Sequence, residues 1–116
     1  MRFFDSEIKL MDIIWRCEPI SAKDASLIAE KEIGWNKNTT YTVIKKLIDK
    51  GYIKREEPGF ICTSLIKKCE VQKREANGLV NRLFQGSKKA LFSALLEDEE
   101  LSESEIAELR EMINSR

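Results

Sequence analysis

Histidine is absent from this sequence of 116 residues, and cysteine and proline are both scarce. Without histidine the chain lacks the commonest general base and the commonest metal ligand of proteins. The three cysteines (Cys17, Cys62 and Cys69) form no C-x-x-C pair, which argues against a disulfide framework and against a structural zinc site. We expect free thiols and no bound metal; the alternative is a redox- or metal-responsive pair formed by Cys62 and Cys69.

Long apolar runs are missing as well. No run approaches the roughly 20 residues that cross a bilayer, and charged residues follow the first few positions where a signal peptide would have its apolar segment. We therefore expect a cytoplasmic protein that does not bind membranes. The sequence also contains no glycine-rich phosphate loop, no nucleophile elbow and no cluster of metal ligands. These absences favour a binding protein without a cofactor over an enzyme.

The formal net charge is zero, but the charges are unevenly distributed along the chain. Residues 70–116 carry seven basic and ten acidic side chains, whereas residues 36–69 carry only three acids. The basic side chains of this middle segment are Lys37, Lys45, Lys46, Lys50, Lys54, Arg55, Lys67 and Lys68. Local potential, and not net charge, attracts a polyanion, so the middle segment is the candidate region for binding nucleic acid.

The first third of the chain has the pattern of two helices. Asp5 or Ser6 is suited to cap a first helix, and Pro19 ends it and begins a short extended piece. Ser21 is suited to cap a second helix, which Gly34 ends.

A third helix and a β-hairpin follow. Asn36 can cap the helix, and Gly51 lies where a left-handed residue ends it. The segments Tyr52–Glu56 and Phe60–Leu65 have β-type composition, and Pro58-Gly59 between them suits a tight turn. Helix, short strand, helix, helix and hairpin, in this order, predict a winged helix-turn-helix.

The outward face of the third helix is polar and basic. Major-groove base edges present hydrogen-bonding groups and thymine methyls, which short polar and basic side chains can contact. The candidate DNA-binding residues on this helix are Asn38, Thr39, Tyr41, Thr42, Lys45 and Lys46. An ordinary solvated helix face is the alternative, and the hairpin directly after the helix favours DNA binding over it. Lys54 and Arg55 of the hairpin are further candidates for phosphate or minor-groove contacts, although the adjacent Glu56-Glu57 would repel DNA.

Residues 70–116 have the pattern of three more helices, each with an apolar stripe. Fully burying one large apolar side chain contributes about 1.5–3 kcal/mol, and a second copy of the chain could bury these stripes. We therefore predict a homodimer; the alternative is a tail that folds back on its own core. The predicted dimerisation residues are Leu79, Leu83, Phe84, Leu91, Phe92, Leu95, Leu96, Ile106, Leu109 and Ile113.

Five segments have a recognisable pattern: Met11–Trp15, Gly34–Val43, Leu47–Ile53, Asn81–Gly86 and Leu101–Arg110. Together they resemble the penicillinase-repressor family of winged-helix regulators, which includes β-lactam-responsive and copper-responsive repressors. The resemblance implies a homodimeric repressor whose winged helices bind a dyad operator in duplex DNA and whose C-terminal helices hold the dimer together. By position, the operator-reading residues that it implies are Asn38, Thr39, Tyr41, Thr42 and Lys46.

Two departures from the family pattern concern the release of repression. Where β-lactam-responsive members are cleaved at an Asn-Phe bond, this chain has Ala94-Leu95. The Cys-x-Cys pairs near the C-terminus of copper-responsive members are also missing. Neither route is therefore expected here, and the sensor or protease that would relieve repression is left open.

We thus expect a mainly α-helical protein with a small β-hairpin. Residues 1–69 form the winged-helix DNA-binding domain, and residues 70–116 form a three-helix dimerisation domain. The expected function is sequence-specific repression of transcription. The alternatives are a winged-helix module that binds other proteins and has no DNA role, or a thiol-sensing regulator.

Overall fold

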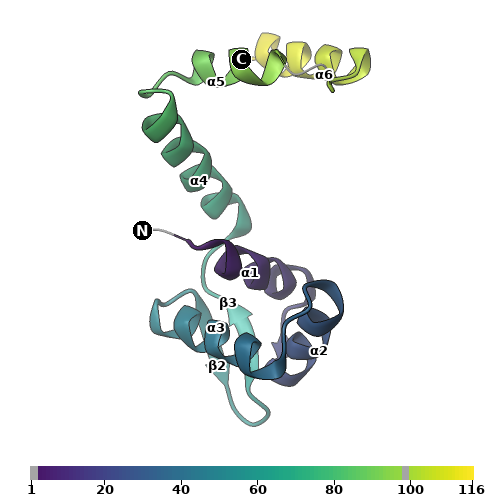
Figure 1. The fold of residues 1–116 in the computed structure, drawn as a ribbon, viewed down its shortest axis with the longest axis vertical. Helices are drawn as coiled ribbons and strands as arrows, with labels where there is room; N and C mark the ends of the chain where they lie inside the picture. Colours follow the sequence, from purple (N-terminus) through teal and green to yellow (C-terminus); the bar gives the residue numbers. More distant parts are fainter. Residues whose placement is uncertain (1–2, 98–99) are drawn as a thin grey trace. The chain divides into compact units, whose positions relative to one another are not determined.

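The computed structural model describes residues 3–97 and 100–116, within which lie six helices and three short strands (Figure 1). Their order is α1 (Asp5–Cys17), β1 (Ile20–Ser21), α2 (Ala22–Glu32), α3 (Lys37–Asp49), β2 (Ile53–Glu56), β3 (Ile61–Ser64), α4 (Lys68–Leu83), α5 (Lys88–Leu96) and α6 (Glu103–Asn114). The predicted mainly α-helical fold is therefore confirmed.

The chain divides into two compact units, Met1–Gln72 and Lys73–Arg116. The predicted domain division between residues 69 and 70 falls inside the first turn of α4, because that helix begins at Lys68. Each unit is described by itself below.

The first unit has one hydrophobic core, to which α1, α2, α3 and both hairpin strands contribute. Its most completely buried apolar side chains are Leu10, Met11, Ile13, Ile14, Ala22, Ala25, Ala29, Ile44, Leu47, Ile53 and Cys62. Burying each of the large ones contributes about 1.5–3 kcal/mol, so this core fixes how the three helices pack. The alanines let α2 pack closely against its neighbours, as their spacing on one helix face predicts.

Local capping signals set where several helices begin. The side chains of Ser21, Asn36 and Ser102 each accept a hydrogen bond from the backbone N–H three residues later, at 3.0, 2.8 and 3.2 Å. The predicted caps at Ser21 and Asn36 are confirmed. Gly51 has φ +83° just after α3, a left-handed conformation that glycine adopts without steric cost.

The start of α1 differs from the prediction that Asp5 or Ser6 caps it. The helix begins at Asp5, and the carboxylate of Glu7 accepts the N–H of Phe4 at 2.9 Å. Glu7 is only 2% exposed, and it also accepts a hydrogen bond from Lys50 Nζ at 3.0 Å. This buried carboxylate thus connects the N-terminal end of α1 to Lys50, the residue that follows α3. A local capping pattern does not reveal such a contact between distant segments.

The hairpin is part of a three-stranded antiparallel sheet with strand order β1-β3-β2. The extended piece predicted after Pro19 is β1, in which Ile20 pairs with Cys62 of β3. We call the hairpin formed by β2, β3 and their turn (residues 53–64) the wing. The pairing with β1 joins the wing to the segment between α1 and α2.

The second unit contains most of α4 together with α5 and α6. Val80 is the one buried hydrophobic residue in the part of this unit that the structure describes. Across residues 3–97 and 100–116, no helix combines the length and the apolar character that spanning a membrane requires.

Candidate nucleic-acid interface

Helix α3 has one buried side and one exposed polar side. Val43, Ile44 and Leu47 are buried in the core of the first unit. The side chains on the other side are exposed, as predicted: Asn38, Thr39, Thr42, Lys45 and Lys46. Because the buried side is fixed by packing, the helix presents these polar groups to solvent on a rigid support.

A shallow hollow lies at the N-terminal end of this exposed side. Its lining residues are Ser6, Trp35, Asn36, Asn38, Thr39, Thr42, Val43 and Lys46. The N-terminal end of a helix carries partial positive charge and backbone N–H donors, and Lys46 adds a full positive charge to the same hollow. The hollow is therefore suited to a negatively charged group such as a phosphate.

Four lining residues were not among our predicted site residues: Ser6, Trp35, Asn36 and Val43. Ser6 comes from the first turn of α1, and Trp35 precedes α3 and is half-buried against the core. The position of Ser6 depends on how α1 packs beside α3, which is a long-range property. Trp35 thus packs against the core and also lies at the edge of the hollow.

Two residues of the polar run in α3 are less exposed than its composition suggests. Thr40 is completely buried, and its hydroxyl donates to the carbonyl of Asn36 at 3.2 Å. Tyr41 is half-buried, and its ring meets Phe60 of the wing edge-on, with 5.8 Å between the ring centroids. The ammonium group of Lys37 lies 5.6 Å from the centre of the Tyr41 ring. Tyr41 therefore lies beside the exposed side of α3 and also contacts the wing.

The wing pairs its own basic residues with its own acids. Lys54 Nζ lies 3.5 Å from a Glu56 carboxylate oxygen, and Arg55 Nη2 lies 2.6 Å from Glu57 Oε1. The hydrogen bond from Arg55, helped by the backbone N–H of Phe60, lowers the pKa of the Glu57 carboxyl. Glu57 is therefore ionised at neutral pH. Both predicted wing cations thus already have an anionic partner within the chain.

Polar contacts hold the wing against the rest of the first unit. The carboxylate of Glu18, at the end of α1, accepts hydrogen bonds from the backbone N–H of Ser64 at 2.9 Å and from its hydroxyl at 2.8 Å. The backbone N–H of Ala22 donates to the carbonyl of Phe60 at 2.9 Å. These bonds join the wing to the end of α1 and to the start of α2.

The three cysteines are free, in agreement with the prediction. Cys62 is buried, and this burial raises the pKa of its thiol, whereas Cys69 is exposed. A raised pKa lowers the thiolate fraction at neutral pH, which disfavours Cys62 as a reactive sensor thiol. No group of three or more potential metal ligands occurs among the residues that the structure describes.

The predicted dimerisation residues lie on α4, α5 and α6, except for Phe84, which directly follows α4. Leu79, Phe84, Leu91, Ile106 and Leu109 are half-buried. The others are between 46% and 64% exposed: Leu83, Phe92, Leu95, Leu96 and Ile113.

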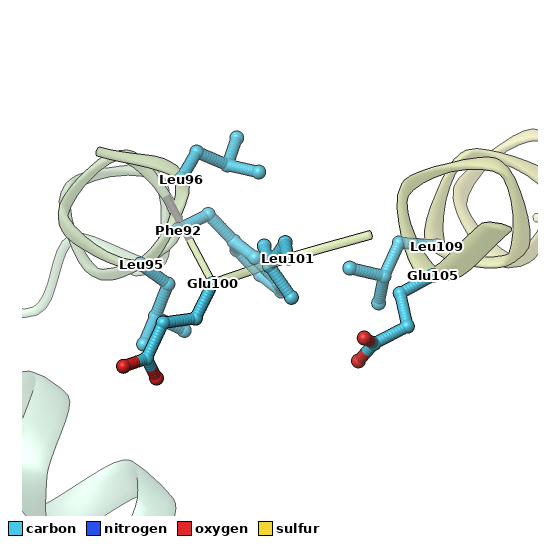
Figure 2. A pocket seen from close by; sticks show the side chains of 7 residues that line it. All are labelled: Phe92, Leu95, Leu96, Glu100, Leu101, Glu105 and Leu109. Atoms are coloured by element: carbon cyan, nitrogen blue, oxygen red, sulfur yellow. The ribbon is translucent and has the colours of Figure 1, made fainter. Parts of the chain in front are cut away.

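Some of these side chains line an apolar hollow between α5 and α6. Figure 2 shows Phe92, Leu95 and Leu96 of α5 on one side and Leu109 of α6 on the other, with Leu101 between them. Glu100 and Glu105 complete the lining. The second unit thus exposes apolar side chains on the helices from which dimerisation was predicted.

Comparison with known families places the chain in context. The sequence profile of the penicillinase repressor family matches residues 4–115, almost the whole chain. This chain belongs to the penicillinase repressor family. The resemblance predicted from the sequence segments is thereby confirmed. Penicillinase repressors regulate transcription and are not enzymes, which also confirms the prediction of a non-enzymatic protein.

Individual relatives match over nearly their full length. The penicillinase repressor of Staphylococcus aureus is 32% identical over 111 residues, which are 94% of this chain and 88% of the relative. The methicillin resistance regulatory protein MecI of Staphylococcus aureus (strain N315) is 28% identical over 113 residues, covering 96% of this chain and 92% of the relative.

Two solved structures share the fold. The solution structure of the DNA binding domain of the repressor BlaI aligns with a TM-score of 0.54 and 26% identity, over 58% of this chain and 84% of that one. The Bacillus licheniformis BlaI monomeric form, in complex with the blaP half-operator, aligns with a TM-score of 0.54 and 25% identity. The alignment covers 60% of this chain and 88% of that one. The winged helix-turn-helix prediction is confirmed.

Proposed function

We propose that this penicillinase repressor family member represses transcription by binding an operator in duplex DNA, with α3 of each protomer in a major groove. The observation that carries the proposal is the exposed side of α3, where Asn38, Thr42 and Lys46 line one hollow while the opposite side is fixed in the core. The family membership and the half-operator complex of a relative support it. We accordingly propose that the protein acts in the cytoplasm.

The exposed groups match the chemistry of the groove. Asparagine can form two hydrogen bonds with adenine, and lysine can reach guanine or a phosphate, so Asn38 and Lys46 have suitable partners on DNA. The hydroxyl of Thr42 donates to the carbonyl of Asn38 at 2.8 Å, which leaves its methyl group suited to a thymine methyl. We assign base reading to Asn38, Thr39 and Thr42 and phosphate contact to Lys45 and Lys46, with Tyr41 at the edge toward the wing.

We further propose a homodimer on a dyad operator, held together by the second unit. Its exposed apolar side chains on α4, α5 and α6 would lose their contact with water against a second copy. In a twofold dimer the two α3 helices can reach successive major grooves, about 34–36 Å apart. A sensor or protease that relieves repression stays a prediction from the family resemblance.

Fluorescence anisotropy with duplexes from the promoter of its own gene tests DNA binding. We expect tighter binding to that promoter than to a scrambled duplex, and an affinity that falls steeply with salt. Thr42→Ala should reduce the difference in affinity between the promoter duplex and the scrambled duplex. Lys9 is an exposed lysine of α1 outside the hollow, so Lys9→Ala should leave this difference unchanged. Equal affinity for both duplexes refutes specific repression, and absent salt-dependent binding favours a protein-interaction module.

A Förster transfer experiment tests the dimer separately. Samples of a Cys69→Ser variant, which lacks the exposed native thiol, are labelled with donor and with acceptor at an introduced terminal cysteine, mixed and then diluted together. We expect transfer that is lost only on extensive dilution. A chain that is monomeric at micromolar concentration, measured in parallel by light scattering, contradicts the dimer while leaving DNA binding by α3 open.

A further inference from the structure

The wing holds the guanidinium of Arg55 against a carboxylate of the same hairpin. Arg55 Nε donates a short charge-assisted hydrogen bond to Glu57 Oε1 at 2.7 Å, and Arg55 Nη2 lies 2.6 Å from the same oxygen in an ion pair. The adjacent pair, Lys54 with Glu56, is longer at 3.5 Å. The two residues of the Arg55–Glu57 pair are separated by a single residue, so the carboxylate and the guanidinium belong to the same short stretch of the wing.

Phe60 fixes the same guanidinium from a second side. The central carbon of the Arg55 guanidinium lies 3.6 Å from the centre of the Phe60 ring, a stacked cation–π arrangement. The other carboxylate oxygen of Glu57 accepts the backbone N–H of Phe60 at 3.2 Å. Phe60 itself has φ +51°, a conformation that a non-glycine residue keeps only where its surroundings hold it. Arg55, Glu57 and Phe60 therefore form one closed arrangement.

We propose that the Glu57 carboxylate binds the hydrogen-bond donors of Arg55 that would otherwise bind a DNA phosphate. While this pair is intact, the wing makes no phosphate contact through Arg55. The inference rests on the proposed function. A carboxylate and a phosphate both accept paired hydrogen bonds from a guanidinium, so they compete for the same donors. Glu57 stays ionised at neutral pH, and its negative charge also repels an approaching phosphate.

As a consequence, α3 determines which DNA sequence is bound, and the wing affects only the affinity for DNA in general. A phosphate contact adds affinity for every duplex regardless of sequence. By withholding that contact, Glu57 lowers binding to all DNA alike and leaves the choice of sequence to the exposed side of α3. Glu57 is therefore a residue that sets affinity without touching DNA.

The test is the salt dependence of DNA affinity for four full-length proteins: the unaltered chain, Glu57→Gln, Arg55→Gln and the double variant. Each phosphate contact contributes about 0.9 to the slope of log affinity against log salt. We expect Glu57→Gln to steepen the slope by about 0.9 per protomer, so that affinity falls about 3.5-fold more between about 50 and 200 mM salt. Arg55→Gln alone, and the double variant, should keep the slope of the unaltered chain.

Three results would overturn the inference. A slope that is flatter by about 0.9 in Arg55→Gln shows that Arg55 already contacts phosphate. An unchanged slope in Glu57→Gln shows that no contact is released. A steepening that persists in the double variant shows that loss of a negative charge, and not release of Arg55, is responsible. If Glu57→Gln fails to fold, Glu57→Ala, which also releases Arg55, replaces it in the series.

The proposed function fails differently, because the unaltered chain would then show no salt-dependent binding to DNA at all. That outcome overturns the inference together with the proposed function. If the unaltered chain binds DNA but the variants do not show the expected slopes of log affinity against log salt, only the inference is overturned.

Discussion

Replacing Lys46 with alanine removes one positive charge from the exposed side of α3 and leaves the buried side of the helix intact. Lys46 lines the hollow at the N-terminal end of this exposed side, and we propose that a DNA phosphate binds in that hollow. Losing one phosphate contact flattens the slope of log affinity against log salt by about 0.9 per protomer. Over a rise from about 50 to 200 mM salt, the variant should therefore lose about 3.5-fold less affinity per protomer than the unaltered chain.

Anisotropy titrations at several salt concentrations measure this slope, with both the promoter duplex and the scrambled duplex. The slope should flatten equally on both, because a phosphate contact carries no sequence information. Lys9→Ala is the matched control, since it removes an exposed lysine of α1. An unchanged slope in Lys46→Ala, or an equal change in Lys9→Ala, would refute the assignment of a phosphate to the hollow.

Three further predictions concern the cap of α3, the thiols and the dimer. Asn36→Ala removes the hydrogen bond to the N–H of Thr39 and should lower the free energy of unfolding by about 1 kcal/mol, measured by urea denaturation; no change would show that the cap contributes nothing. Iodoacetamide should label exposed Cys69 quickly and Cys62 slowly, and because burial raises the Cys62 pKa, its reaction should increase only at higher pH than that of an ordinary thiol; rapid labelling of Cys62 at neutral pH contradicts this. Leu95→Glu introduces a charge on the apolar face of α5 and should shift the dimer toward monomer in sedimentation experiments, while Lys89→Glu on the same helix should not; equal effects would place the interface elsewhere.

Local signals made much of the first unit predictable. The caps at Ser21 and Asn36 and the left-handed Gly51 each act within a few residues, so their patterns are visible in the sequence. The burial of Thr40 was also visible in principle. It precedes Ile44 by four residues and Leu47 by seven, so the helical period places it on the buried side.

Other features depend on contacts between distant segments. The cap at the start of α1 uses Glu7, whose burial is compensated by Lys50. The pairing of β1 with β3 joins residues about forty positions apart, as Ile20 opposite Cys62 shows. The wing's internal ion pairs likewise require the geometry of the hairpin, because the sequence shows neighbouring charges without showing which of them meet.

Chemical-shift mapping by NMR tests the central claim most directly, namely that the exposed side of α3 is the surface that binds operator DNA. Adding a promoter duplex to isotope-labelled protein should shift the amide signals of Asn38, Thr39, Thr42 and Lys46 more than those of α2, and a scrambled duplex should do so more weakly. Promoter-induced shifts confined to other elements, with the α3 signals unmoved, would contradict the account.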